Sequence, residues 1–347
     1  MRNVQNYILA SPSLCCTYFL YVHIYSSHKL LKTNSFSWER LPRLSYLFMK
    51  YLSKALSRRK GCLYNPRERK KWDVVYAVHN CRLSTVLLRR YCSAAGYGWD
   101  YPDSEYRGVP LCFPEVMCRT LLLMAITDHN FRLSPVGLVC VRQSIKTHQP
   151  VDELKRGPFT LQVQVLVYRP MDVGVEVDVL LSATSRSKSL VWESILTLLS
   201  KNKNQVAIEC EANNENATLT RKKDEADFQG VKQVHFKVPL SAGPPCSWSF
   251  LEYWFLYLPD TLFGFKLRPM SSLWMLSVCL AEIEKHKGVG VITSPLNILA
   301  QFEERLLTPN KVTLSFWRCQ SSTQDLSFQM YQHEGTKFYL TGGIARN

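Results

Sequence analysis

The sequence predicts an α+β fold in which antiparallel strands cover a buried helix, and in which this unit occurs twice. The segment from Ser271 to Lys287 has a helical pattern that is apolar nearly all the way round, so it must be covered on every side. Strand patterns follow it and provide that cover. A second apolar helix pattern begins at Pro114, about 155 residues before Pro269, and strands follow it in the same order. A chain of 347 residues is long enough for such a doubled fold.

The chain begins with a basic arm, residues 1–60, ahead of a nearly neutral body. The first 71 residues contain 14 Lys and Arg against 2 Asp and Glu, which is +12 of the total net charge of +15. The remaining 29 basic and 26 acidic residues give only +3. A body of this kind does not have the basic face of a nucleic-acid-binding protein. The arm instead indicates targeting or contact with a membrane surface.

Within the arm, residues 7–25 contain no Lys, Arg, Asp or Glu. Nineteen residues at helical rise span about 28 Å, which is enough to cross the hydrocarbon core of a bilayer. Lys29 and Lys32 follow the segment, so an anchored protein would have its body in the cytoplasm. A cleaved signal peptide, a mitochondrial presequence and a disordered tail are the alternatives. We therefore expect a membrane-associated protein, with a mitochondrial location as the alternative.

The second part of the arm, Leu44 to Lys60, has a basic amphipathic helical pattern. An apolar face is predicted at Leu44, Leu47, Phe48, Tyr51, Leu52 and Leu56, with Lys50, Lys54 and Arg58 largely off it. A helix of this kind can lie on an anionic membrane surface. It can equally pack on the body as an ordinary surface helix.

The first half of the body is predicted at residues 61–200. A helix with Pro114 in its first turn runs to Asp128, and a strand covers Val136 to Ile145. Strict alternation then predicts long antiparallel strands at 159–167 and 173–181, with a turn at 169–172. A third strand is predicted at 190–199, after a Ser-rich turn at 183–189.

Residues 201–230 are polar and charged, which is typical of a flexible linker. The second half, residues 231–347, contains the Ser271 helix. Ser271 or Ser272 can cap its first turn, and Gly288 suits the left-handed residue that ends it. The predicted strands are 299–306, 311–317, 326–331 and 337–341.

The cysteine and histidine residues do not form a recognisable metal site. Twelve cysteines are scattered without a C-x-x-C pair, so we predict reduced, largely buried thiols and no bound metal. His129 and His148 are isolated residues on predicted loops. They are expected to be surface residues.

Several motifs resemble those of the MaoC-like acyl dehydratases and (R)-specific enoyl-CoA hydratases. The segment F-G-F-K-x-R-P at 263–269 precedes a W-M-L-x-x-C-L-A helix at 274–281. A matching block lies upstream at Val109 to Leu111, Phe113-Pro114, Gly137 to Arg142 and Val191 to Ser194. The resemblance covers roughly residues 106–342. It implies a double hot-dog fold in lipid metabolism, an acyl-CoA or acyl-carrier thioester as ligand, no cofactor, and a homodimer as one assembly that the family allows.

The catalytic residues of that family are missing from this sequence. The resemblance implies an Asp and a His five positions apart, which transfer protons beside the double bond; here those positions fall near Ser249 and Trp254. Residues 236–259 contain neither Asp nor His. The family's glycine at the helix start, an oxyanion donor, is also absent, which leaves Ser271, Ser272 and Leu273 as the predicted substrate-binding residues.

These departures predict a relative that is catalytically inactive in this form, a pseudoenzyme. Two explanations are open: a gene that has lost the site, or a frame or splice variant over residues 241–262. The other hypothesis for function is a membrane-associated binding or scaffold protein, whose hot-dog body binds an acyl chain or a partner.

Overall fold

The structure, a computed structural model, describes residues 18, 20–31, 33–65, 74–98, 100–103, 108–202, 231–238, 268–318, 325–333 and 335–346. Most described strands form one sheet of eleven, which is antiparallel except for the β1–β2 pair. Its order is β1-β2-β4-β5-β6-β3-β9-β13-β12-β11-β7. The strands are β1 (Ser35–Ser37), β2 (Val75–Cys81), β3 (Leu138–Thr147), β4 (Phe159–Met171), β5 (Gly174–Thr184), β6 (Leu190–Lys201), β7 (Lys232–Val238), β8 (Arg268–Pro269), β9 (Leu296–Phe302), β10 (Leu307–Thr308), β11 (Asn310–Arg318), β12 (Leu326–Gln332) and β13 (Phe338–Arg346).

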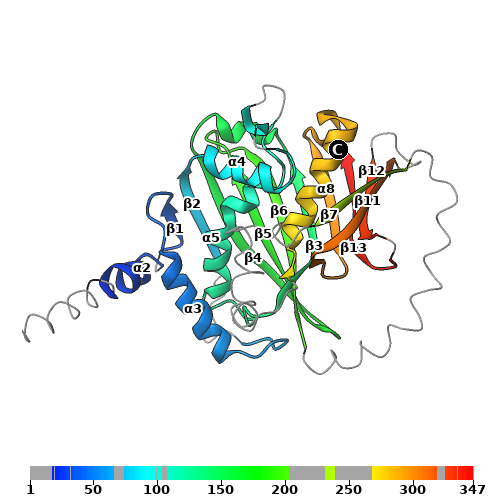
Figure 1. Ribbon diagram of the computed structural model, residues 1–347. Helices are drawn as coiled ribbons and strands as arrows, with labels where there is room; N and C mark the ends of the chain where they lie inside the picture. Colours follow the sequence, from blue (N-terminus) through cyan, green and yellow to red (C-terminus); the bar gives the residue numbers. More distant parts are fainter. Residues whose placement is uncertain are drawn as a thin grey trace, which may run out of the picture.

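The described helices include two long ones that occupy equivalent places in the two halves of the sheet. These are α5 (Phe113–Thr127) and α8 (Ser272–Lys287), and Figure 1 shows both in front of the strands. The others are α2 (Ser26–Leu30), α3 (Leu44–Ser57) and α4 (Thr85–Ala94), with short helices η1 (Leu20–Tyr25), η2 (Tyr101–Asp103), η3 (Val151–Lys155) and η6 (Val289–Ile292).

The strand order shows that the two halves have the same topology. From the outer edge inward, the first half reads β2-β4-β5-β6-β3 and the second reads β7-β11-β12-β13-β9. In each half the chain makes one outer strand, then the long helix, then the strand at the centre of the sheet, and then the remaining three. The predicted repeat of helix and strand is therefore confirmed.

The two halves meet where β3 and β9 pair as antiparallel neighbours. Six residue pairs make this seam, from Arg142–Gln301 to Thr147–Leu296. Ile145 pairs with Ile298, and both side chains are fully buried. Paired residues project to the same face of a sheet, so α5 and α8 share a single interior.

The central helices are buried as their all-round apolar patterns predicted. In α8 every residue from Leu273 to Ala281 is buried, and α5 is similarly enclosed. Ser271 accepts a hydrogen bond from the Trp274 N–H and so caps α8, while Gly288 ends it with φ of 84°. The sequence thus placed both ends of this helix correctly.

The strand predictions are confirmed with shifts at their ends. Residues 169–171, expected in a turn, still belong to β4. The strand expected at 299–306 is β9, Leu296–Phe302, in which alternate residues from Leu296 are buried and Leu299 points outward. The predicted linker falls almost entirely outside the described residues, as does most of the 7–25 segment. Nothing in the part of the chain that is described forms a helix long and apolar enough to cross a membrane.

Residues of the basic arm contribute directly to the fold. Strand β1 extends the sheet by pairing in parallel with β2, and α3 packs against α5. The predicted apolar face of α3 was partly wrong. Leu56 is 90% exposed and Leu44 and Leu52 are also exposed, whereas Lys54, predicted off that face, is buried. Lys54 is inside because its amine binds backbone carbonyls at the end of α5, as described below.

Candidate functional site at the start of helix α8

The start of α8 is held by its own cap and by a short pair of strands. The Ser271 hydroxyl accepts a hydrogen bond of 3.1 Å from the Trp274 N–H. Strand β8, just before the helix, pairs with β10, and the Met270 N–H donates to the Leu306 carbonyl at 2.7 Å. Ser271 and Leu273 are buried and Ser272 is half-buried. The three residues predicted to bind substrate therefore lie together at one rigid helix start.

A second set of contacts fixes this helix start against α4 of the first half. The Trp274 indole N–H donates to the Ala94 carbonyl at 2.9 Å. The Tyr91 hydroxyl donates to the Ser277 hydroxyl at 2.7 Å, and Ser277 in turn donates to the Leu273 carbonyl at 2.6 Å. A chain of buried hydrogen bonds therefore links the two halves at this end of α8.

The buried groups of this region do not exchange protons near neutral pH. Burial raises the pKa of Tyr91 well above its usual value, and the neighbouring Cys112 thiol adds to the effect. Burial likewise raises the pKa of the Cys112 thiol, with Glu115 contributing. Because both groups stay protonated, they can position neighbours but cannot act as a catalytic base.

The start of α5 carries a different polar cluster, which sequence analysis missed. The Gln143 side-chain amide on β3 donates to the Glu115 carboxylate at 2.5 Å and to the Ser194 hydroxyl at 3.2 Å. Gln143 is 1% exposed, so these bonds hold the carboxylate in place. The residues lie 28 and 51 positions apart, and the sequence contains no local pattern that joins them.

The other predicted residues do not join a described site. The positions assigned to the family's catalytic pair, Ser249 and Trp254, lie outside the described residues. His129 is largely exposed, with Asp128 at 3.5 Å. His148 is also exposed, and its ring lies 3.2 Å from Glu193. Within the described ranges no three His, Cys, Asp or Glu side chains gather in a way that could hold a metal ion.

The cysteines that the structure describes are free thiols. They are Cys62, Cys81, Cys92, Cys112, Cys118, Cys140 and Cys279, and all but Cys62 are buried. Burial raises the pKa of the Cys92 thiol to about 12, with Glu284 adding to the shift. Because thiolates are the reactive form, buried thiols of this kind are chemically inert.

Two equivalent helix-and-sheet halves joined through central strands define the double hot-dog class. No protein-family model and no curated protein matches the sequence. Solved structures do match, and they show that this chain has the double hot-dog fold of the MaoC-like dehydratases.

Three of these structures illustrate the similarity. HtdX of Mycobacterium tuberculosis matches with a TM-score of 0.55 at 13% identity, over 78% of this chain and 98% of that one. A MaoC-like dehydratase from Phytophthora capsici matches with a TM-score of 0.54 at 14% identity, over 79% and 95%. The peroxisomal multifunctional enzyme type 2 of Drosophila melanogaster gives 0.55 at 11% identity, over 79% of this chain and 48% of that one.

Proposed function

We propose that this protein is a MaoC-like double hot-dog protein that binds an acyl thioester without hydrating it. One sequence observation carries the proposal: residues 236–259, where the resemblance places the catalytic Asp and His, contain neither residue type. Loss of a general acid or base costs on the order of 10²–10⁴ in rate. A protein that lacks both groups keeps the fold but has no route for the proton transfers.

The start of α8 supports the binding part of the proposal. Among the described residues, none accepts a hydrogen bond from the Leu273 N–H, which lies in the first turn. A helix N-terminus carries about half a positive charge, which suits the carbonyl oxygen of a thioester. The buried apolar side chains of Leu273 and Trp274 suit the acyl chain beside it.

The catalytic part is tested by hydration of crotonyl-CoA with the purified full chain. The full chain is used because α3 and β1 belong to the fold. We expect no loss of enoyl absorbance above a buffer control. Turnover would contradict the proposal, and it would place the catalytic groups at residues other than an Asp–His pair in 236–259.

The binding part is tested by calorimetric titration of hexanoyl-CoA, with coenzyme A alone as the reference ligand. Saturable binding that needs the acyl chain is expected. Ser272→Glu places a carboxylate beside the helix start and should weaken binding about tenfold or more, because an unpaired charge next to a buried carbonyl is costly.

Thr85→Glu is the matched control for that variant. Thr85 is the first residue of α4, which is capped by Ser84 as α8 is capped by Ser271. The Thr85→Glu variant should bind hexanoyl-CoA as the wild type does. Equal weakening by both variants, or no binding by the wild type, would contradict the assignment of α8.

A second candidate function, attachment to a membrane surface, is favoured by the outer side of α3. The exposed apolar residues there are Leu44, Met49, Leu52 and Leu56. The net charge of +12 on residues 1–71 complements an anionic bilayer. The protein would then act as a membrane-associated binding or scaffold protein with its body in the cytoplasm; a mitochondrial location is the alternative.

Sedimentation with vesicles of phosphatidylserine and phosphatidylcholine tests this second function. Leu56→Ser should reduce the bound fraction, because Leu56 is 90% exposed on α3. Leu299→Ser, a control at a 52% exposed leucine on β9, should not. An unchanged bound fraction for Leu56→Ser would remove α3 from the membrane contact. Processing between residues 30 and 60 during mitochondrial import would support the alternative location.

A further inference from the structure

A cavity of about 260 Å³ lies at the opposite end of α8 from the site described above. It is lined by Lys287, Gly290, Val291, Arg318, Asp325, Leu326 and Arg346. The three basic residues are the last residues of three elements: Lys287 ends α8, Arg318 ends β11 and Arg346 ends β13. The fold therefore brings three cations from distant parts of the chain to one place.

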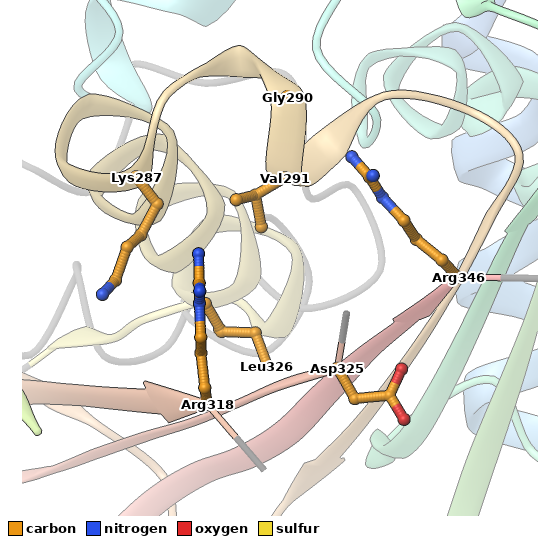
Figure 2. A pocket seen from close by; sticks show the side chains of 7 residues that line it. All are labelled: Lys287, Gly290, Val291, Arg318, Asp325, Leu326 and Arg346. Atoms are coloured by element: carbon orange, nitrogen blue, oxygen red, sulfur yellow. The ribbon is translucent and has the colours of Figure 1, made fainter. Parts of the chain in front are cut away.

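The two arginines face the cavity because of their register in the strands. Arg318 is two residues beyond Phe316, and Arg346 is two residues beyond Ile344; both of these apolar residues are buried. Residues two apart on a strand project to the same face, so each arginine continues the row that faces α8. Figure 2 shows both guanidinium groups extending from the strand ends toward Gly290 and Val291.

The charge around the cavity is strongly positive. Lys287, Arg318 and Arg346 face a single carboxylate, Asp325, which leaves a net charge of +2 on the lining side chains. Within the described ranges, neither arginine has a carboxylate within 4.0 Å, the limit for an ion pair. The C-terminus of α8 adds about half a negative charge, which does not reverse the sign.

The floor of the cavity is apolar and its third cation is held in place. Val291 and Leu326 supply the apolar surface. The Lys287 ammonium lies 5.9 Å from the centre of the Phe316 ring, a distance at which a cation is attracted to an aromatic face. The cavity thus offers cations above a small hydrophobic surface.

We propose that this cavity binds a small phosphorylated ligand, a phosphate ester with a short apolar group. Guanidinium groups bind phosphate through paired hydrogen bonds, and the apolar floor takes the ester group. The volume is below the range of about 300–1,000 Å³ for larger ligands, so the cavity suits a phosphate or diphosphate with a small substituent. The 16 residues of α8 separate it by about 24 Å from the helix start, so it does not depend on the proposed thioester binding.

Calorimetric titration of the full chain with phenyl phosphate, at low ionic strength, tests the proposal. One saturable site is expected, and Arg318→Gln or Arg346→Gln should each weaken it about tenfold or more, since a hydrogen bond to a charged group contributes about that factor. The double variant should abolish measurable binding. Added sodium chloride should weaken binding by screening.

Arg305→Gln is the matched control, because it removes the same charge near the opposite end of the paired strands β9 and β13. Arg305 follows the end of β9 at Phe302, which pairs with Leu340, whereas Arg346 pairs with Leu296 at the start of β9. This variant should bind as the wild type does. Equal weakening by Arg305→Gln, or no saturable binding by the wild type, would overturn the site.

A parallel titration with inorganic phosphate shows whether the ligand is a phosphate ester or free phosphate. Phenyl phosphate should bind more tightly than inorganic phosphate, because its ring contacts Val291 and Leu326. Equal affinities would overturn the assignment of an ester ligand, and Leu326→Ala should then leave both affinities unchanged. If the assignment is right, Leu326→Ala weakens only phenyl phosphate.

Discussion

Substitution of Lys54 provides a quantitative test of how the basic arm is built into the fold. Lys54 is 8% exposed. Its amine nitrogen lies 3.1 Å from the Ile126 carbonyl oxygen and 3.0 Å from that of Phe131, and it also contacts the Asp128 carbonyl; a neutral amine donates to two of these three oxygens at a time. It also lies 5.1 Å from the centre of the Phe131 ring. Lys54→Met keeps the length and the apolar contact but removes the amine.

The expected effect depends on pH because the amine loses its proton in the folded state. The pKa of Lys54 is lowered from 10.5 to about 6; burial is the largest cause, Arg58 and Lys50 contribute, and Asp128 opposes the shift. Between these two pKa values the unfolded chain holds the proton and the folded chain does not. The free energy of unfolding therefore rises with pH, by about 1.4 kcal/mol per pH unit.

The pH dependence is measured by urea denaturation of the wild type and of Lys54→Met at pH 7, 8 and 9. Unfolding is followed by tryptophan fluorescence. The difference in free energy of unfolding, wild type minus variant, should rise by about 3 kcal/mol from pH 7 to pH 9. Groups that titrate in both proteins contribute equally to the two free energies of unfolding, so their contributions cancel in the difference. Lys311→Met, at an exposed lysine on β11, should follow the wild-type profile. A pH-independent difference for Lys54→Met would refute the reasoning, because it would mean that the ammonium stays charged in the fold.

Other substitutions test the interior and the location. Leu280→Ala should cost about 2–5 kcal/mol in urea denaturation, since Leu280 is fully buried; Leu299→Ala at the outer face of β9 should cost under about 0.5 kcal/mol. Tyr91→Phe removes the hydrogen bond to Ser277 and should cost about 1 kcal/mol in the same assay. In cells, the full chain should pellet with membranes and resist carbonate extraction, with Asn216 unmodified; a freely soluble protein or a glycosylated Asn216 would contradict that location.

The lack of Asp and His in residues 236–259 has two explanations that transcripts can separate. Reads that cover codons 241 to 262 in the same frame would support a gene that has lost its site. Reads that encode an Asp and a His in that segment would show that the present sequence is a variant of an active one. The hydration assay should then be repeated on the protein from that transcript.

Local signals predicted the interior of this fold well. Alternating residues gave the long strands, and the serine before Trp274 and the glycine after Lys287 gave the two ends of α8. These features depend on neighbours in the chain, so a single sequence displays them. The position of Lys54 could not be predicted in this way, because its partners at the end of α5 lie 72 to 77 residues away.

The candidate site was predictable only in part for the same reason. Ser271, Ser272 and Leu273 were predicted as substrate-binding residues because the family resemblance points to this helix start, which has a local sequence pattern. The hydrogen bond from Tyr91 to Ser277 joins residues 186 positions apart. No repeating sequence pattern predicts a hydrogen bond between two such distant side chains. The cationic cavity was missed because its arginines matter by their place at strand ends, which depends on the register of the whole sheet.

The β3–β9 seam has a consequence for how the protein could be divided. The chain passes from β6 to β7 through residues 203–230, yet these two strands are not neighbours in the sheet. A cut in that segment therefore interrupts no described strand, and in the described sheet β3–β9 is the strand pair that joins the two fragments. Two fragments, 1–202 and 231–347, would each present one long unpaired edge, and edges of this kind seek a partner strand. Coexpressed, they should reassemble through β3 and β9 into one protein; expressed singly, each should aggregate. A split reporter fused at this position would thus report the docking of one half on the other.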